Sequence, residues 1–201
     1  MTVKAQNDYC GITKWHEAGI TGKGVVIWNA ERSITSHGSL TTKRILDSAP
    51  DATVINGSLG STVRNKKIVE VVVTTDDGTR YEVEEFIQKF NIKLITRSMG
   101  GTKSHEDLWS EFWQPLKEKY NLIFFVSAGN EGSEGRDCGF PPAIAILVGA
   151  CGLINGKPKR DYYSSIDEEV DFVTFRGVGT TGTSFASPYL CGQAALLVQK
   201  Y

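Results

Sequence analysis

The 201-residue sequence predicts an α/β fold of three layers, in which a mainly parallel β-sheet is covered by helices on both faces. Two observations predict it. Short runs of branched and aromatic residues recur along the chain, as expected for buried strands. Between them lie stretches with apolar residues at helical spacing, which suit right-handed crossover helices. The length fits one domain with a sizeable core, so we expect a single domain over residues 1–201.

Five apolar runs are the predicted strands, at residues 24–28, 52–55, 92–95, 122–126 and 144–148. Crossover helices are predicted over residues 83–90 and 108–120, where the apolar residues fall on one helical face. A last helix is predicted over residues 187–200, because Pro188 suits a first helical turn. This helix is apolar nearly all round, so we expect it to be buried.

Residues 61–82 do not fit this alternation. Two strand-like runs, at 68–73 and 80–83, flank the pair Asp77-Gly78. An Asp-Gly pair between two such runs is typical of a tight hairpin turn. We therefore expect a hairpin insertion at the surface near residues 61–82.

Charge and hydropathy point away from two classes of partner. The 22 Lys and Arg residues nearly balance the 23 Asp and Glu residues, and no run of like charge suggests a nucleic-acid or membrane surface. The first ten residues, MTVKAQNDYC, lack the apolar core of a signal peptide, and no apolar stretch is long enough to cross a bilayer. We expect a cytoplasmic protein made without a pro-domain; a processed, secreted form is the alternative.

The four cysteines are Cys10, Cys138, Cys151 and Cys191. They lack the paired short spacings of metal sites, and we expect no metal and no cofactor. The chain is large enough to fold without disulfides, so reduced thiols are predicted. Two disulfides in a secreted protein remain open.

The strongest motif is G-T-S-F-A-S-P-Y-L-C-G, at residues 182–192. It places Ser184 between a glycine loop and the start of a helix, where backbone N–H groups and the helix dipole favour negative charge on a nearby oxygen. Alone, Thr183-Ser184 would be interpreted as a helix N-cap. The string resembles the serine motif of subtilisin-like serine peptidases (subtilases), G-T-S-x-A-x-P-x-x-x-G, at every specified position. The resemblance implies that Ser184 is the nucleophile of a serine endopeptidase whose substrates are proteins or peptides.

A second motif, A-G-N-E-G at residues 128–132, follows the predicted strand 122–126. An asparagine side chain at the carboxyl edge of a parallel sheet can donate to a carbonyl oxygen, although alone Asn130 could be a turn residue. The motif resembles the family's oxyanion segment and implies that Asn130 is the oxyanion donor.

Two segments are the expected substrate-binding edges. Ser98, Met99, Gly100 and Gly101 resemble the family's S-x-G-G edge, which pairs with an extended peptide. Taken alone, this run could be a strand that ends at a Gly-Gly turn. Ser127, Ala128 and Gly129 are the second predicted edge. The pocket walls are expected near residues 127–129 and 138–142.

His37 is the candidate general base. The run H-G-S starts at His37. It resembles the family's run that begins H-G-T and continues through a short helix. Ser39 replaces the usual threonine, and the second histidine often seen beyond the glycine is absent. His16 and His105 are expected at the surface. The alternative for His37 is a loop histidine without a partner.

The segment that would carry the acid of the triad departs from the family pattern more than the other motifs do. Aligning residues 21–34 without gaps on the family pattern T-G-x-G-V-x-V-A-V-I-D-T-G-I places Glu31 at the aspartate, which implies a Ser-His-Glu triad. A gapped alignment would place Asn29 there, and an amide supplies no charge and favours the wrong histidine tautomer. A solvated carboxylate beside Arg32 is the third interpretation.

Departures from the family leave alternatives open. Only five residues separate Glu31 from His37, where the family has a long loop, so a more open cleft is expected. The family's calcium-binding loops are not identifiable. The changed acid segment would also fit a catalytically weak pseudopeptidase that binds peptides or a protein partner in the same groove. Self-cleavage, or cleavage of one dedicated partner, is a further possibility.

Overall fold

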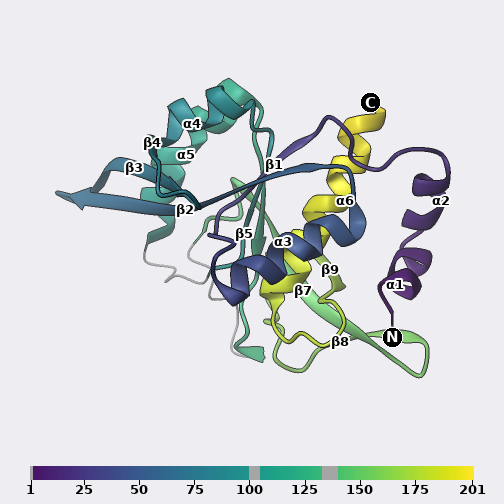
Figure 1. The fold of residues 1–201 in the computed structure, drawn as a ribbon. Helices are drawn as coiled ribbons and strands as arrows, with labels where there is room; N and C mark the ends of the chain where they lie inside the picture. The colour runs from purple at the N-terminus through teal and green to yellow at the C-terminus, as the bar shows by residue number, and fades with distance from the viewer. Residues whose placement is uncertain (1, 100–104, 133–139) are drawn as a thin grey trace.

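The computed structural model describes residues 2–99, 105–132 and 140–201, and these form three layers (Figure 1). One sheet runs through the middle in the order β4-β3-β2-β1-β5-β6-β7-β8, and β9 pairs with β7. The pairs β1–β2, β1–β5, β5–β6, β6–β7 and β7–β9 are parallel. The pairs β2–β3, β3–β4 and β7–β8 are antiparallel. The predicted three-layer α/β fold is confirmed.

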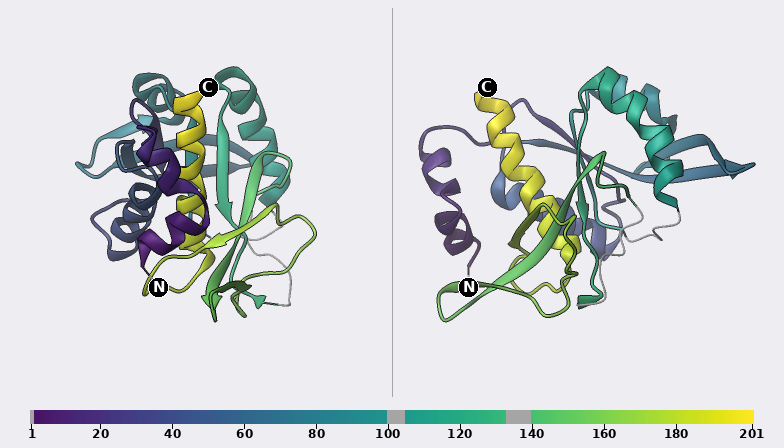
Figure 2. Two further views of the ribbon diagram at one scale, coloured as in Figure 1. Left: turned by 90° about the vertical axis from the view of Figure 1, so that its right-hand side faces the viewer. Right: turned by 180° about the vertical axis from the view of Figure 1, so that it is seen from behind.

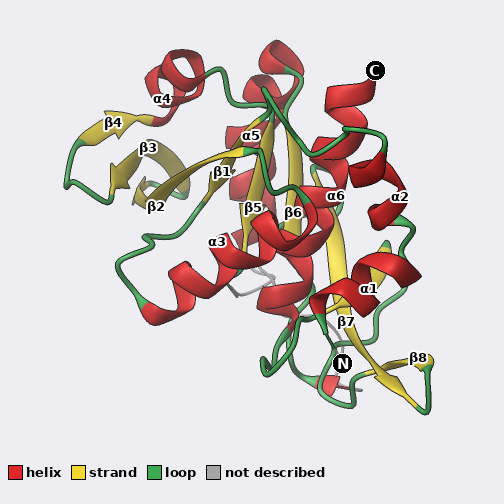
Figure 3. Cartoon of the chain, turned by 45° about the vertical axis from the view of Figure 1, so that its right-hand side comes forward, coloured by secondary structure: helices red, strands yellow, loops and turns green. Residues whose placement is uncertain are grey.

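The strands are β1 (Val26–Asn29), β2 (Thr53–Arg64), β3 (Lys67–Thr75), β4 (Arg80–Glu82), β5 (Leu94–Arg97), β6 (Ile123–Ser127), β7 (Ala145–Ile154), β8 (Lys157–Arg160) and β9 (Phe172–Phe175). The helices are α1 (Val3–Tyr9), α2 (Ile12–Glu17), α3 (Ser36–Ser48), α4 (Val83–Phe90), α5 (Glu106–Tyr120) and α6 (Ala186–Lys200), with a short 3₁₀ helix η3 (Thr183–Phe185) directly before α6. Figure 3 shows α3 and α6 in front of the central strands. No described helix has both the length and the apolar character needed to cross a membrane.

Each face of the sheet has its own core because successive side chains of a strand point to opposite faces. On β1, Trp28 packs against Phe86 of α4, with ring centroids 5.1 Å apart. Its neighbour Ile27 belongs to the other core, which contains Ile45 of α3 and Tyr189 of α6. Both faces of the central strands are therefore buried, as the continuous apolar runs indicate.

The region around residues 61–82 differs in part from the predicted hairpin insertion. The Asp77-Gly78 turn joins β3 to β4 as expected. However, β2 does not end near residue 55 but continues to Arg64 and pairs with β3 in a two-stranded arm (Figure 1). Gly57 lies within this strand, and a Cβ there would sit 2.6 Å from Val73 Cγ1. Close packing of β2 on β3 therefore requires glycine at this position.

The helices α1 and α2 were not predicted. α2 contributes Ile12 and Trp15 to the core that contains α3 and α6, whereas α1 is held by polar contacts. Asn7 Nδ2 donates to the carbonyl oxygen of Asp47 at 2.7 Å, and Tyr189 Oη donates to Asn7 Oδ1 at 2.7 Å. The guanidinium of Arg44 donates to Gln6 Oε1 at 3.2 Å. These bonds hold α1 beside α3 and α6, which Figure 2 shows from two further sides.

Candidate active site

The candidate residues gather at the carboxyl edge of the parallel strands, where open α/β sheets bind ligands. Glu31 follows β1, Ser98 follows β5 and Asn130 follows β6. His37 lies in the first turn of α3, and Ser184 lies in η3. The sheet order β1-β5-β6 makes these strand ends neighbours.

Glu31 and His37 are in direct contact. Glu31 Oε2 lies 2.6 Å from His37 Nδ1. The Glu31 side chain is only 9% exposed and that of His37 is 43% exposed. The hydrogen bond that His37 donates to Glu31 raises the pKa of His37 above its ordinary value. Partial burial opposes this increase, and the negative charge of Glu31 adds to it. This contact fixes Nδ1 as the protonated nitrogen of a neutral ring and leaves Nε2 as the acceptor.

The loop between Glu31 and His37 is tightly packed against α3. Thr35 is the N-cap of α3, and its Oγ1 accepts from Gly38 N at 2.9 Å. The same hydroxyl donates to the carbonyl oxygen of Arg32 at 2.9 Å. A Cβ at Gly38 would lie 2.1 Å from that oxygen, so only glycine allows this approach. The glycine after His37 thus has a packing role beside the candidate acid.

Asn29, the rival for the acid position, lies elsewhere. Its side chain is fully buried, and its Nδ2 lies 3.0 Å from Thr41 Oγ1, 3.1 Å from Thr42 Oγ1 and 2.9 Å from Asn56 Oδ1. These contacts direct the amide toward α3 and β2. Its Oδ1 has no hydrogen-bond partner within the described residues.

Ser184 and Ser98, the residue that follows β5, are joined by a reciprocal pair of hydrogen bonds. Its Oγ donates to the carbonyl oxygen of Ser98 at 3.1 Å, and Ser98 Oγ donates to the carbonyl oxygen of Ser184 at 2.7 Å. The ring of His37 packs 5.2 Å from that of Phe185, the next residue along the chain. Among the described residues no hydrogen bond joins Ser184 to His37. In a substrate-free structure such bonds are often long and tighten only in the complex.

Asn130 is oriented by the serine motif itself. Its Oδ1 accepts from Thr183 N at 2.9 Å and from Thr183 Oγ1 at 3.2 Å. With the oxygen held in this way, Nδ2 is the free end of the amide. Gly182 has φ +123°, which brings the loop close to Asn130 without a side chain between them.

Two supporting residues had no motif that could reveal them. Ser165 clamps the segment around Asn130: its Oγ donates to Glu131 Oε2 at 2.8 Å and accepts from Glu131 N at 3.2 Å, and its own N–H donates to Gly129 O at 3.2 Å. Asp76, in the turn between β3 and β4, contacts the loop that carries Glu31. Both lie more than 30 residues from their partners in sequence, so no local pattern signals them.

The predicted substrate-binding edges are only partly visible. Ser98 is buried, whereas Met99 is half exposed; Gly100 and Gly101 lie outside the described residues. Ser127, Ala128 and Gly129 are described and are all buried. Of the predicted walls at 138–142, Cys138 and Gly139 lie outside the described residues.

The remaining histidines and cysteines take other places. His16 Nε2 lies 2.8 Å from the carbonyl oxygen of Ser48, and His105 precedes α5. Cys10, Cys151 and Cys191 are free thiols. No group of three His, Cys, Asp or Glu side chains in the described ranges is arranged to hold a metal ion.

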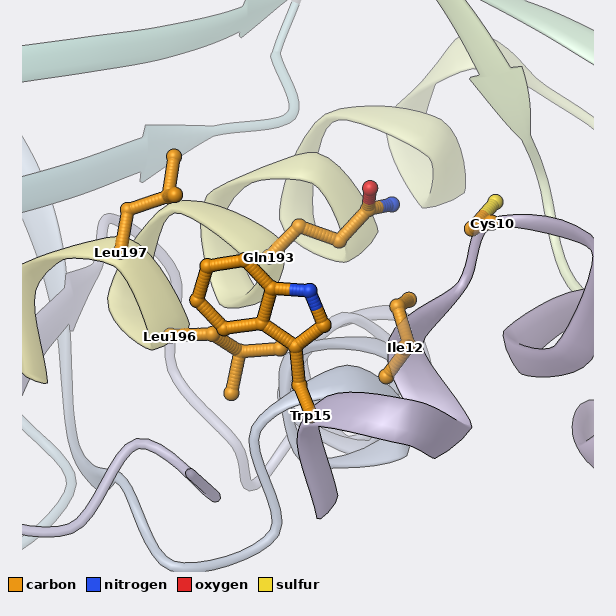
Figure 4. Close-up of a pocket in the computed structure, with 6 residues that line it drawn as sticks. All are labelled: Cys10, Ile12, Trp15, Gln193, Leu196 and Leu197. Carbon is orange, nitrogen blue, oxygen red and sulfur yellow. The ribbon is translucent and has the colours of Figure 1, made fainter. Parts of the chain in front are cut away.

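A cavity of about 150 Å³ lies away from these residues. Figure 4 shows its walls, which come from α2, α6 and Cys10, the residue that follows α1. They are Cys10, Ile12, Trp15, Gln193, Leu196 and Leu197. It adjoins the carboxyl half of α6, whereas Ser184 precedes the amino end of that helix.

Comparisons with known proteins agree with this architecture. No family model matches the chain. Subtilisin NAT from Bacillus subtilis subsp. natto is 30% identical over 125 residues, covering 55% of this chain and 32% of that protein. Subtilisin DY from Bacillus licheniformis is 28% identical over 133 residues, covering 58% of this chain and 46% of that protein. The chain thus spans less than half the length of these curated relatives.

Solved structures are similar over most of the chain. The prenylagaramide maturation protease PagA superposes with a TM-score of 0.66 at 19% identity, covering 94% of this chain and 81% of that one. Fervidolysin from Fervidobacterium pennivorans, described as a keratinolytic enzyme related to subtilisin, gives a TM-score of 0.65 at 15% identity, covering 93% of this chain and 38% of that one. The fold is subtilisin-like.

Proposed function

We propose that this chain, which has a subtilisin-like fold and resembles subtilisins in sequence over more than half its length, is a serine endopeptidase with a Ser184-His37-Glu31 triad. The observation that carries the proposal is the 2.6 Å contact between Glu31 Oε2 and His37 Nδ1. It supports a role for Glu31 in orienting the imidazole and stabilising its charged form, as an aspartate does in related triads.

The proposed first step is attack by Ser184 on a peptide carbonyl carbon. When substrate binds, the hydroxyl hydrogen turns from the Ser98 carbonyl toward His37 Nε2, which takes the proton as Oγ attacks. A C–O bond forms, and the carbonyl oxygen becomes negative. The 5.2 Å packing of the His37 ring on Phe185, beside Ser184, supports this assignment of the base.

Asn130 is the proposed oxyanion donor. Its Oδ1 is occupied by Thr183, so Nδ2 is available to donate to the negative oxygen, together with the backbone N–H of Ser184. A preoriented donor needs no rearrangement as the charge develops, which is the reason such groups lower the barrier.

The second half of the reaction releases the two products. His37 returns its proton to the leaving amine as the C–N bond breaks, which leaves an acyl-enzyme. Water then attacks the ester carbonyl carbon, and His37 takes the proton from that water. His37 passes this proton to Ser184 Oγ as the bond between Oγ and the acyl carbon breaks, which releases the acid product and restores the serine. The chain's substrates on this proposal are proteins or peptides bound in extended form at the edge that begins with Ser98.

Incubation of the folded protein with an unfolded protein such as reduced casein tests the proposal. The expected result is release of peptides that stops in Ser184→Ala. Mass spectrometry of the enzyme in the same reaction reports self-cleavage at Ser184-dependent sites. If the folded wild type binds the substrate and releases no peptide, the peptidase proposal fails and a binding role replaces it.

A further inference from the structure

The loop that carries Glu31 is pinned on one side by α3. Arg32 O accepts from Thr35 N at 3.2 Å and from Thr35 Oγ1, and Gly38 packs against the same oxygen. These contacts fix the carboxyl half of the loop. They act on residues after Glu31 and do not touch its carboxylate.

The opposite side of the loop is held by Asp76, 43 residues further along the chain. Ser33 N donates to Asp76 Oδ1 at 2.9 Å, and Ser33 Oγ donates to Asp76 Oδ2. Arg32 Nη2 donates to the carbonyl oxygen of Asp76 at 3.1 Å. Both carboxylate oxygens and the backbone of Asp76 are thus directed at the two residues that follow Glu31.

Hydrogen bonds within the turn between β3 and β4 fix the position of Asp76. Thr75 N donates to Thr79 O at 2.9 Å, and Gly78 N donates to Thr75 O at 2.9 Å. The carboxylate of Asp77 accepts from Thr75 Oγ1 at 2.6 Å and from Thr79 N at 2.9 Å, and these bonds lower the pKa of Asp77 to about 2. The turn ends β3, which is joined to β1 through β2.

We propose that Asp76 is a positioning residue, which holds the backbone of Ser33 and Arg32 so that the Glu31 carboxylate meets His37 Nδ1. The inference rests on the proposed function of Glu31. A short loop must bring a carboxylate to within 2.6 Å of the imidazole, and such contacts lose much of their effect when displaced by about 1 Å. The loop is thus held on one side by α3 and on the other by the turn between β3 and β4.

Asp76→Asn and Asp77→Asn form a matched pair for the test. Each removes one negative charge from the same turn, so a general electrostatic effect on His37 is shared by both. Only Asp76 contacts Ser33 and Arg32. The positioning effect is therefore measured as the difference between the two variants in the property of the site that is measured, such as the pKa of His37.

The first readout is the pKa of His37, measured by NMR titration of the imidazole in folded protein. Because the Glu31 hydrogen bond raises this pKa, we expect Asp76→Asn to lower it toward 6.5 further than Asp77→Asn does. This measurement requires no activity, so it judges the inference even if the chain proves not to be a peptidase. Equal His37 pKa values in the two variants would overturn the proposal.

The second readout separates kcat from KM on a peptide substrate. We expect Asp76→Ala to lower kcat by about 10–100-fold with little change in KM, because substrate binding does not involve the turn. In a Ser33→Ala background the same substitution should have a smaller effect, because the hydrogen bond from Ser33 Oγ to Asp76 is already absent there and only the bond from Ser33 N remains to be lost from the carboxylate. Urea unfolding identifies variants that fail to fold, and a folded Asp76→Ala enzyme with wild-type kcat would contradict the proposal.

Discussion

Glu31 Oε2 lies 2.6 Å from His37 Nδ1, although only five residues separate the two in the chain. The alternative acid, Asn29, is instead fully buried among Thr41, Thr42 and Asn56. The carboxylate of Glu31, and not the amide of Asn29, therefore lies against the imidazole of His37.

Glu31→Gln tests the role of the carboxylate. An amide cannot stabilise the imidazolium and can favour the wrong tautomer, so we expect kcat to fall by about 10³–10⁴-fold. Steady-state kinetics on a peptide substrate measure this. Glu31→Asp is the companion variant: it keeps the charge but retracts it, and we expect a fall of about 10²-fold. Full activity in Glu31→Gln would remove Glu31 from the triad.

The pH dependence of kcat/KM reports the same contact. His37 must be neutral to accept the Ser184 proton, so activity rises as pH increases through the His37 pKa. Glu31 raises this pKa, so we expect the acid limb to have its midpoint above 6.5. In Glu31→Gln the limb should move to lower pH, because the group that raises the pKa is lost. A limb that stays in place would mean that another group controls it.

Asn130→Leu tests the oxyanion donor. Loss of one such donor lowers kcat by about 10²–10³-fold with little effect on KM, because the interaction forms in the transition state. Thr183→Val is the matched control. It removes the hydroxyl that contacts Asn130 but keeps the backbone N–H that orients it, so a smaller decrease is expected. Unchanged kcat in Asn130→Leu would assign the oxyanion to other donors.

Gly192→Ala tests the packing role of the last glycine in the serine motif. A Cβ there would lie 2.1 Å from Ser48 Oγ and 2.5 Å from the carbonyl oxygen of Ile45, where α6 crosses α3. We expect a fall in the free energy of unfolding of about 1–3 kcal/mol, measured in urea. Gly60→Ala is the control, because its Cβ would meet nothing closer than 3.9 Å. Equal stability of the two variants would contradict this reading.

The central fold could be predicted because its signals are local. Residues 83–90 form a helix with the predicted bounds, and the five apolar runs all correspond to strands. The extension of β2 could not be predicted, because glycines such as Gly57 and Gly60 are unfavourable within a strand. Only the pairing with β3 shows why the strand continues through them. The helix α1 depends on Asn7, whose partners come from α3 and α6.

In the candidate site, too, the residues in local motifs could be predicted and the residues that act across the fold could not. Ser184, Asn130 and His37 lie in motifs whose residues are adjacent in sequence. Asp76 and Ser165 act across the fold through one or two polar contacts each, and isolated Asp and Ser residues carry no such signal. The placement of Glu31 needed the structure of its loop, because sequence alone left Asn29 in contention.

The most direct test of the account is labelling of the folded protein with a fluorophosphonate, which reacts with an activated serine. We expect covalent modification of the peptide that contains Ser184, identified by mass spectrometry. Labelling should be absent in Ser184→Ala and much slower in Glu31→Gln, although both variants remain folded. Folded wild-type protein that stays unlabelled, or label found on another residue, would contradict the proposal that Ser184 is an activated nucleophile.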